Sequence, residues 1–183
     1  NPEPEVVLVC GPDGKIAGAT LGNDVNLRDF EGRSALLLGR AKDNNASASL
    51  GPFIRLLDDH FTMTDIRNAD LSLEVTGTDG YVLSGSSTMR VISRDPEDLA
   101  QQMFDCHQYP DGAVLYTGTL FAPTDDRDRP GEGFTHKLGD VVRITSSRLG
   151  CLENVVGRSD ALPEWEDGAL ALFRSLSKRG IAV

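Results

Sequence analysis

Three acidic residues near the start of the chain have spacing that suits a metal site. Glu3 and Glu5 are separated by one residue in the stretch PEPEV, and Asp24 follows the next apolar stretch. Side chains two positions apart on a strand point to the same face at a spacing of about 6 to 7 Å. Carboxylates this close stay ionised together only beside a positive charge, and their hard oxygen atoms favour Mg²⁺, with Mn²⁺ or Ca²⁺ as alternatives.

A β-hairpin is the element expected to bring these carboxylates together. Apolar runs lie on both sides of GPDG, a turn sequence in which Pro sets φ and Gly adopts a positive φ. If this turn pairs Cys10 with Lys15, Glu3 lies opposite Gly22 and Asp24 lies at the same end of the hairpin. The alternative is that the two glutamates form an acidic edge against aggregation and that Asp24 caps the next helix.

Length and charge exclude several classes of protein. The 183 residues are enough for one domain with a core, and the net charge of −10 argues against binding to nucleic acid. No apolar run approaches the roughly 18 residues of a membrane span, so we expect no membrane partner. The odd number and wide spacing of the three cysteines favour free thiols in a reducing cytoplasm. The first residues, NPEPEVVLV, lack an initiator Met and already show a strand pattern, which predicts a C-terminal fragment of a longer chain.

The remaining pattern predicts a mainly β fold with a few helices, of the α+β class. A second hairpin is expected around TDG, and Asp95 followed by Pro96 predicts the start of a helix. We also expect a tail helix that ends at Gly180. Further strands are predicted in GPFIRLLDDHF, GAVLYTGTLFAP, DVVRITS and CLENVVG. The three cysteines, expected to be free and buried, are Cys10, Cys106 and Cys151.

Several motifs occur in the order found in one enzyme family. They are EPEVVLV, GNDVNLRD, GRAKDNNAS, GPFIRL, YTGTLF and GDVVRI. Together they resemble the fumarylacetoacetate hydrolase superfamily from Glu3 to about Val156, and AKDNNAS with GPFIRL is most similar to its 2-keto-3-deoxy-pentonate dehydratases. The resemblance implies that residues 1–183 are a single catalytic domain, a mixed β-sandwich roll that forms a homodimer.

The resemblance also implies roles for individual residues. The metal ligands would be Glu3, Glu5 and Asp24, the catalytic residue Lys42, and the substrate-binding residues Arg28, Glu31 and Thr119. Without the resemblance, Lys42 would be interpreted as a solvated loop lysine, Arg28 as a surface partner of Glu31, and Thr119 as an ordinary strand residue.

The implied activity is Mg²⁺-dependent dehydration of a 2-keto-3-deoxy pentonate in pentose catabolism, through a metal-stabilised enolate. One alternative is a C–C bond hydrolase for acylpyruvate or fumarylpyruvate, and another is a non-catalytic module for divalent ions or dimerisation. Hydrolases of this type use a His-x-x-Glu segment before the Glu-x-Glu strand, and this chain begins too late to contain it. We therefore expect the general base upstream of residue 1.

Overall fold

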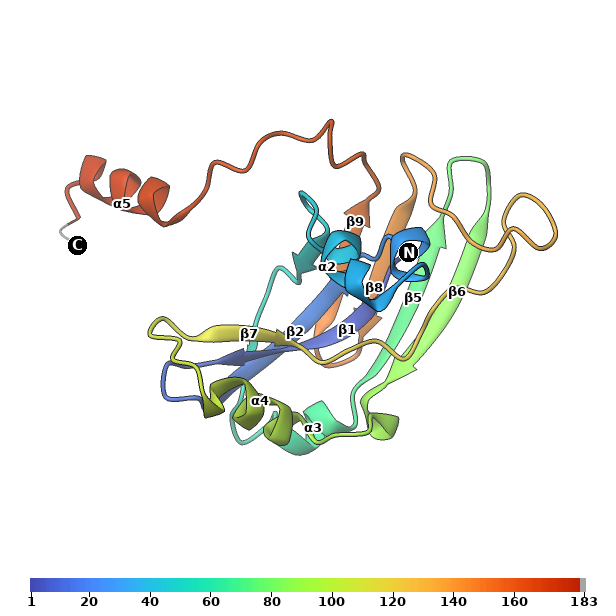
Figure 1. Cartoon of the computed structure of the whole chain (residues 1–183). Helices are drawn as coiled ribbons and strands as arrows, with labels where there is room; N and C mark the ends of the chain where they lie inside the picture. The colour runs from blue at the N-terminus through green and yellow to red at the C-terminus, as the bar shows by residue number, and fades with distance from the viewer. Residues whose placement is uncertain (182–183) are drawn as a thin grey trace.

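The computed structural model describes residues 1–181, which form two curved antiparallel sheets that pack against each other (Figure 1). The first sheet has the order β3-β2-β1-β7, with β4 also paired to β2, and the second has the order β6-β5-β8-β9. The strands are β1 (Pro4–Cys10), β2 (Ile16–Asp24), β3 (Ala48–Leu50), β4 (Arg55–Leu56), β5 (Asp70–Thr76), β6 (Val82–Thr88), β7 (Ala113–Tyr116), β8 (Val141–Ser146) and β9 (Gly150–Val155).

Short helices lie between the strands, and one more helix follows the last strand. They are α1 (Arg28–Glu31), α2 (Leu38–Lys42), α3 (Met63–Arg67), α4 (Pro96–Asp105) and α5 (Ala169–Lys178), with 3₁₀ helices η1 (Ala35–Leu37) and η2 (Met89–Val91). Helix α5 stands apart from both sheets at the end of a long extended segment (Figure 1). Within residues 1–181, no helix is both long enough and apolar enough to cross a membrane.

The core lies between the two sheets. Alternate residues of β5 are buried, as period-2 patterning requires for a strand with one solvated face. Strand β1 is different, because nearly all of its residues are buried. The central core residues include Val6, Leu8, Leu21, Leu71, Leu73, Val75, Val142 and Ile144. Because β1 is covered on both faces, a carboxylate on this strand lies in a poorly solvated environment.

The predicted mainly β fold is confirmed, and so are several elements. Strands β5 and β6 form the second hairpin, and the side chain of Asp95 caps α4 by accepting a hydrogen bond from the Glu97 N–H, with Pro96 at the first helical position. The tail helix is also present. These elements depend on short-range turn and cap chemistry, which the sequence displays directly.

The predicted register of the first hairpin is wrong by two residues. Cys10 pairs with Ile16 instead of Lys15, because the loop is five residues long, and a β-bulge shifts the pairing again next to Val9. Glu5 therefore lies opposite Gly22. A shift of two preserves which face each side chain occupies, so the three carboxylates still share one face.

Two other expectations are also corrected. The run GPFIRLLDDHF forms only the two-residue strand β4 and is largely exposed, with Phe53 80% accessible. This run has enough apolar residues for a buried strand. Its strand β4, however, pairs with β2, off the main order of the first sheet. Of the three free cysteines, only Cys10 is buried, whereas Cys106 and Cys151 are exposed at the end of α4 and on β9.

Candidate active site

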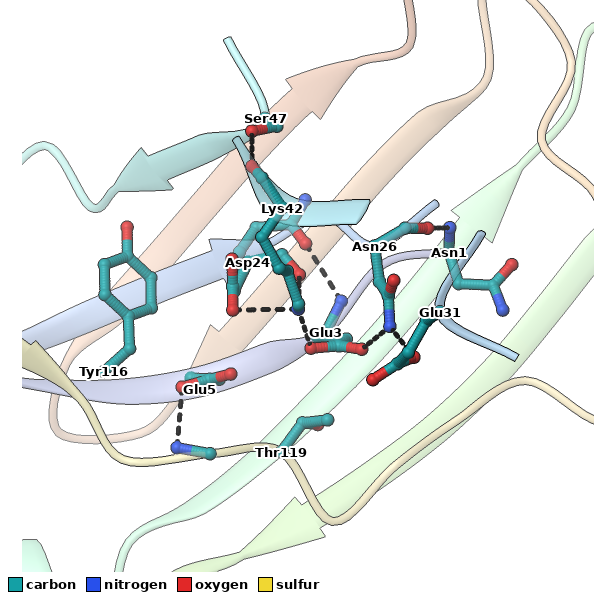
Figure 2. A network of polar contacts seen from close by, with 12 residues as sticks. Asn1, Glu3, Glu5, Asp24, Asn26, Glu31, Lys42, Ser47, Tyr116 and Thr119 are labelled. Atoms are coloured by element: carbon teal, nitrogen blue, oxygen red, sulfur yellow. Dashed lines mark hydrogen bonds and ion pairs between the residues drawn. The ribbon is translucent and has the colours of Figure 1, made fainter. Parts of the chain in front are cut away.

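The hairpin of β1 and β2 brings three carboxylates together at one end (Figure 2). Glu3 precedes β1, Glu5 is its second residue, and Asp24 ends β2. One oxygen atom from each carboxylate lies within 4.8 Å of the others. Glu5 is buried, while Glu3 and Asp24 are half-buried. The cluster therefore combines one carboxylate with almost no solvent contact, Glu5, with two that solvent can reach.

Burial has a strong effect on Glu5. Burial, together with the nearby charges of Asp24 and Glu3, raises the pKa of Glu5 to about 7. The backbone N–H of Gly118 donates a hydrogen bond to Oε2 of Glu5 at 2.7 Å, which offsets part of this shift. A buried carboxylate beside two others requires a positive partner if all three are to be ionised at neutral pH.

Lys42, at the end of α2, provides one positive charge. Its ammonium group donates hydrogen bonds to Oε2 of Glu3 at 2.5 Å and to Oδ2 of Asp24 at 2.8 Å. Burial lowers the pKa of Lys42, but the hydrogen bonds to Asp24 and Glu3 outweigh burial, so the net shift is upward. Lys42 is therefore an ammonium at neutral pH and is suited to stabilise negative charge.

The donor set fits a hard divalent cation. The three carboxylates lie at the same end of the hairpin, and they can supply the oxygen ligands that Mg²⁺, Mn²⁺ and Ca²⁺ prefer. The buried Glu5, with its raised pKa, adds a specific reason for a cation here, since an adjacent positive charge favours its ionised form. Because Glu3 and Asp24 are only half-buried, an ion held by the three would remain open to a ligand on that side.

The residues expected to bind substrate lie on two segments next to the cluster. Arg28 begins α1, is exposed, and donates a hydrogen bond to the carbonyl of Pro123 at 3.1 Å. Glu31 ends α1 and is half-buried. Thr119 follows Gly118 and exchanges hydrogen bonds of 3.2 Å with the backbone of Phe121. Arg28 thus ties α1 to the segment that carries Thr119.

Two residues near the cluster were not anticipated from the sequence. Asn26 is buried and donates hydrogen bonds to Glu3 and Glu31 (Figure 2). Tyr116 donates its hydroxyl to the carbonyl of Ser49 at 2.8 Å, and burial, with Asp24 and Glu5 nearby, raises its pKa to about 12. Asn26 lies inside the motif GNDVNLRD, so its polar side chain between two charged positions was the signal available for it.

A separate cavity of about 690 Å³ has Asn23 in its wall, on the opposite face of β2 from Asp24. Glu3, Glu5 and Asp24 do not line it. His136 does, and its Nδ1 lies 3.2 Å from Oδ2 of Asp140. Burial lowers the pKa of His136 to about 4. His136 is thus neutral at pH 7, lines this cavity and does not join the carboxylate cluster.

The chain is similar in sequence to two known dehydratases. It is 31% identical over 154 residues to the 2-dehydro-3-deoxy-D-arabinonate dehydratase of Saccharolobus solfataricus, covering 82% of this chain and 47% of that protein. It is 30% identical over 155 residues to the probable 2-keto-3-deoxyxylonate dehydratase of Haloferax volcanii, covering 85% and 50%. The chain spans about half the length of the curated relatives it matches.

A solved structure agrees with this relationship. A 2-keto-3-deoxy-D-arabinonate dehydratase, complexed with magnesium and 2,5-dioxopentanoate, superposes with a TM-score of 0.73 at 32% identity. The match covers 85% of this chain and 52% of that one. The model of the fumarylacetoacetate (FAA) hydrolase C-terminal family matches residues 13–157. The chain therefore belongs to the fumarylacetoacetate hydrolase family.

Proposed function

We propose that this chain carries the metal-dependent active site of a dehydratase that acts on a 2-keto-3-deoxy sugar acid, a pentonate. The observation that carries the proposal is the convergence of three carboxylate oxygens within 4.8 Å, with Lys42 bonded to two of the three groups. The relationship to two dehydratases at about 30% identity supports this substrate class. Glu3, Glu5 and Asp24 would hold Mg²⁺, which polarises the carbonyl of a bound 2-keto acid.

The chain's own residues supply charge and orientation. The ammonium of Lys42 stabilises negative charge that develops on the substrate when the C3 proton leaves, because it stays protonated at neutral pH. Loss of the C4 hydroxyl then completes the elimination of one water molecule. Arg28 is exposed on α1 and can orient a carboxylate or hydroxyl groups through its planar fork of N–H donors.

Glu31 and Thr119 complete the proposed substrate contacts. Glu31, a hydrogen-bond acceptor, suits a hydroxylated substrate, because hydroxyl groups can donate to its carboxylate. Thr119 is half-buried beside Gly118, whose N–H is bonded to Glu5. It therefore lies where a ligand of the carboxylate cluster could reach its hydroxyl group.

The test is product analysis with the whole protein that contains this chain. With Mg²⁺ and a 2-keto-3-deoxy pentonate, mass spectrometry should show loss of one water molecule, and Asp24→Asn should abolish turnover without unfolding the protein. Gain of water with an acylpyruvate substrate would instead identify a C–C hydrolase. Absence of turnover on both substrate classes, in a folded protein that has bound Mg²⁺, would favour a non-catalytic module.

A further inference from the structure

Asn26 is a buried amide placed between two carboxylates. It lies between β2 and α1 and is only 3% exposed. Its Nδ2 donates a hydrogen bond to Oε1 of Glu3 at 2.9 Å and another to Oε2 of Glu31 (Figure 2). The amide nitrogen carries two hydrogen atoms, so it can donate one to each carboxylate. This single side chain connects the residue before β1 with the last residue of α1.

The orientation of this amide is determined by charge. Within residues 1–181, the buried Oδ1 of Asn26 accepts no hydrogen bond. Rotating the amide by half a turn would direct this oxygen toward Glu3 and Glu31, replacing two attractions with two repulsions. The free energy gained from two hydrogen bonds to charged acceptors exceeds the cost of one buried carbonyl without a partner. Position 26 thus requires a neutral side chain with two N–H donors on one nitrogen.

Asn26 restricts the carboxylate of Glu3. Oε1 of Glu3 is bonded to Asn26, and Oε2 is bonded to Lys42 at 2.5 Å. With both oxygens engaged by donors from different segments, rotation of this carboxylate would break at least one charge-assisted hydrogen bond. Hydrogen-bond partners of this kind orient metal ligands and tune their affinity for the ion.

The same amide also anchors α1. This helix has only four residues and contains no buried residue, so core packing does not hold it in place. Its side chains make two hydrogen bonds to the rest of the described chain: Arg28 donates to the carbonyl of Pro123, and Glu31 accepts from Asn26. The position of α1 therefore depends in part on Asn26, as does the position of the two residues that it presents to the site.

We propose that Asn26 is a positioning residue that fixes Glu3 for metal binding and couples it to α1, which carries Arg28 and Glu31. The inference rests on the proposed function, in which Glu3 holds a divalent ion. It predicts that metal binding and the order of α1 change together when the amide is removed.

The first measurement is Mn²⁺ affinity by calorimetry, with circular dichroism to verify folding. Asn26→Leu has a similar size but no donor, and its Mn²⁺ affinity should fall by about 10-fold to 100-fold. Asn26→Ser retains one donor and should fall between Asn26→Leu and the unaltered chain. The matched control is Asn68→Leu, because Asn68 is exposed at the end of α3 and donates to Thr64. This control should bind Mn²⁺ within twofold of the unaltered chain.

The second measurement is hydrogen exchange of residues 28–31 with and without Mn²⁺. The ion should protect these amides in the unaltered chain and should protect them much less in Asn26→Leu. This difference reports coupling, which a purely structural role for Asn26 would not produce in a folded variant.

The outcomes separate the inference from the proposed function. If the unaltered chain binds Mn²⁺ and a folded Asn26→Leu binds it equally well, the inference is overturned and the proposed function stands. If Asn26→Leu does not fold, Asn26→Ser decides, and unchanged affinity and protection in that variant overturn the inference. If the unaltered chain binds no Mn²⁺, both are overturned.

Discussion

The ammonium of Lys42 donates a hydrogen bond of 2.8 Å to Oδ2 of Asp24, so a lysine shares a carboxylate with the candidate metal site. Lys42 also bonds Oε2 of Glu3. A cation bound by these carboxylates would lie close to a second positive charge, and the two would repel each other. Under the proposed function, Lys42 would therefore oppose metal binding while it stabilises negative charge on the substrate.

Replacing Lys42 with methionine should separate these two effects. At pH 8, above the pKa of about 7 for Glu5, we expect Lys42→Met to bind Mg²⁺ at least about fivefold more tightly, because a repulsive charge is removed. Turnover of the 2-keto acid at saturating Mg²⁺ should fall by about 100-fold or more. Calorimetry and a product assay measure the two quantities.

Lys15→Met is the control, because Lys15 is exposed and pairs only with Asp13 among the described residues. It should change neither affinity nor turnover. Weaker Mg²⁺ binding by Lys42→Met at this pH would contradict the electrostatic argument.

The raised pKa of Glu5 predicts how metal binding depends on pH. In the metal-free chain this pKa is about 7, so below pH 7 a proton competes with the ion for the same carboxylate. Mn²⁺ affinity should therefore fall by up to about tenfold for each pH unit below 7, and binding at pH 6 should release close to one proton.

Glu5→Gln tests the origin of this dependence. It removes the titrating group, so the variant should bind Mn²⁺ more weakly at pH 8 and with a much flatter pH profile between pH 7 and about pH 5.5, above the usual pKa of carboxylates. Calorimetry in two buffers of different ionisation enthalpy gives both the affinity and the proton release. An unchanged slope in Glu5→Gln would assign the dependence to another group.

The hairpin of β1 and β2 shows why the sequence predicts which carboxylates come together better than it predicts the register of the two strands. Alternation along a strand depends only on spacing, so Glu3 and Glu5 are placed on one face whatever the register. The register depends on the loop length and on the bulge near Val9, which the letters GPDG do not specify. The error of two residues did not change the face on which each carboxylate lies, because only an odd shift moves side chains to the other face.

Residues that depend on distant partners were not predictable in the same way. Arg127 lies in the charged stretch DDRDRPGEG, which the sequence presents as a solvated loop, yet its side chain is 1% exposed and paired with Asp140. Asn26 is fixed by Glu3, 23 positions earlier in the chain. Such contacts arise when separate loops meet, and local propensity does not encode them.

Gly22 provides a third test, at the contact between the hairpin and β7. A Cβ at Gly22 would lie 2.4 Å from Cγ2 of Val7 and 2.5 Å from Cε1 of Tyr116, so these two side chains leave no room for a larger residue. Gly22→Ala should therefore destabilise the fold by about 1 to 3 kcal/mol, measured by urea unfolding.

Gly39→Ala is the matched control for this substitution. Gly39 is in α2 with nothing within 4 Å of the added Cβ, so alanine should be neutral or slightly stabilising. Adding Tyr116→Ala to Gly22→Ala should cost less than the sum of the two single changes, because the smaller side chain removes one of the two clashes. Full additivity would show that the ring is not what restricts position 22.

The buried ion pair between Arg127 and Asp140 gives the last prediction. The guanidinium makes two hydrogen bonds to the carboxylate, at 2.5 and 2.8 Å, and both side chains are almost fully buried. Arg127→Met should lower the free energy of unfolding by about 3 to 5 kcal/mol, because Asp140 keeps a buried charge without its main partner. Urea unfolding at pH 7 measures this loss.

The exposed pair of Arg158 and Asp160 is the control, since Arg158→Met should cost at most about 1 kcal/mol. Adding Asp140→Asn to Arg127→Met should restore part of the lost stability, because an amide at position 140 carries no charge and can still accept the Lys137 N–H that now binds Asp140 at 2.8 Å. If Arg127→Met cost no more than Arg158→Met, the buried pair would contribute no more to stability than an exposed one. The buried pair would then be a consequence of the fold instead of one of its supports.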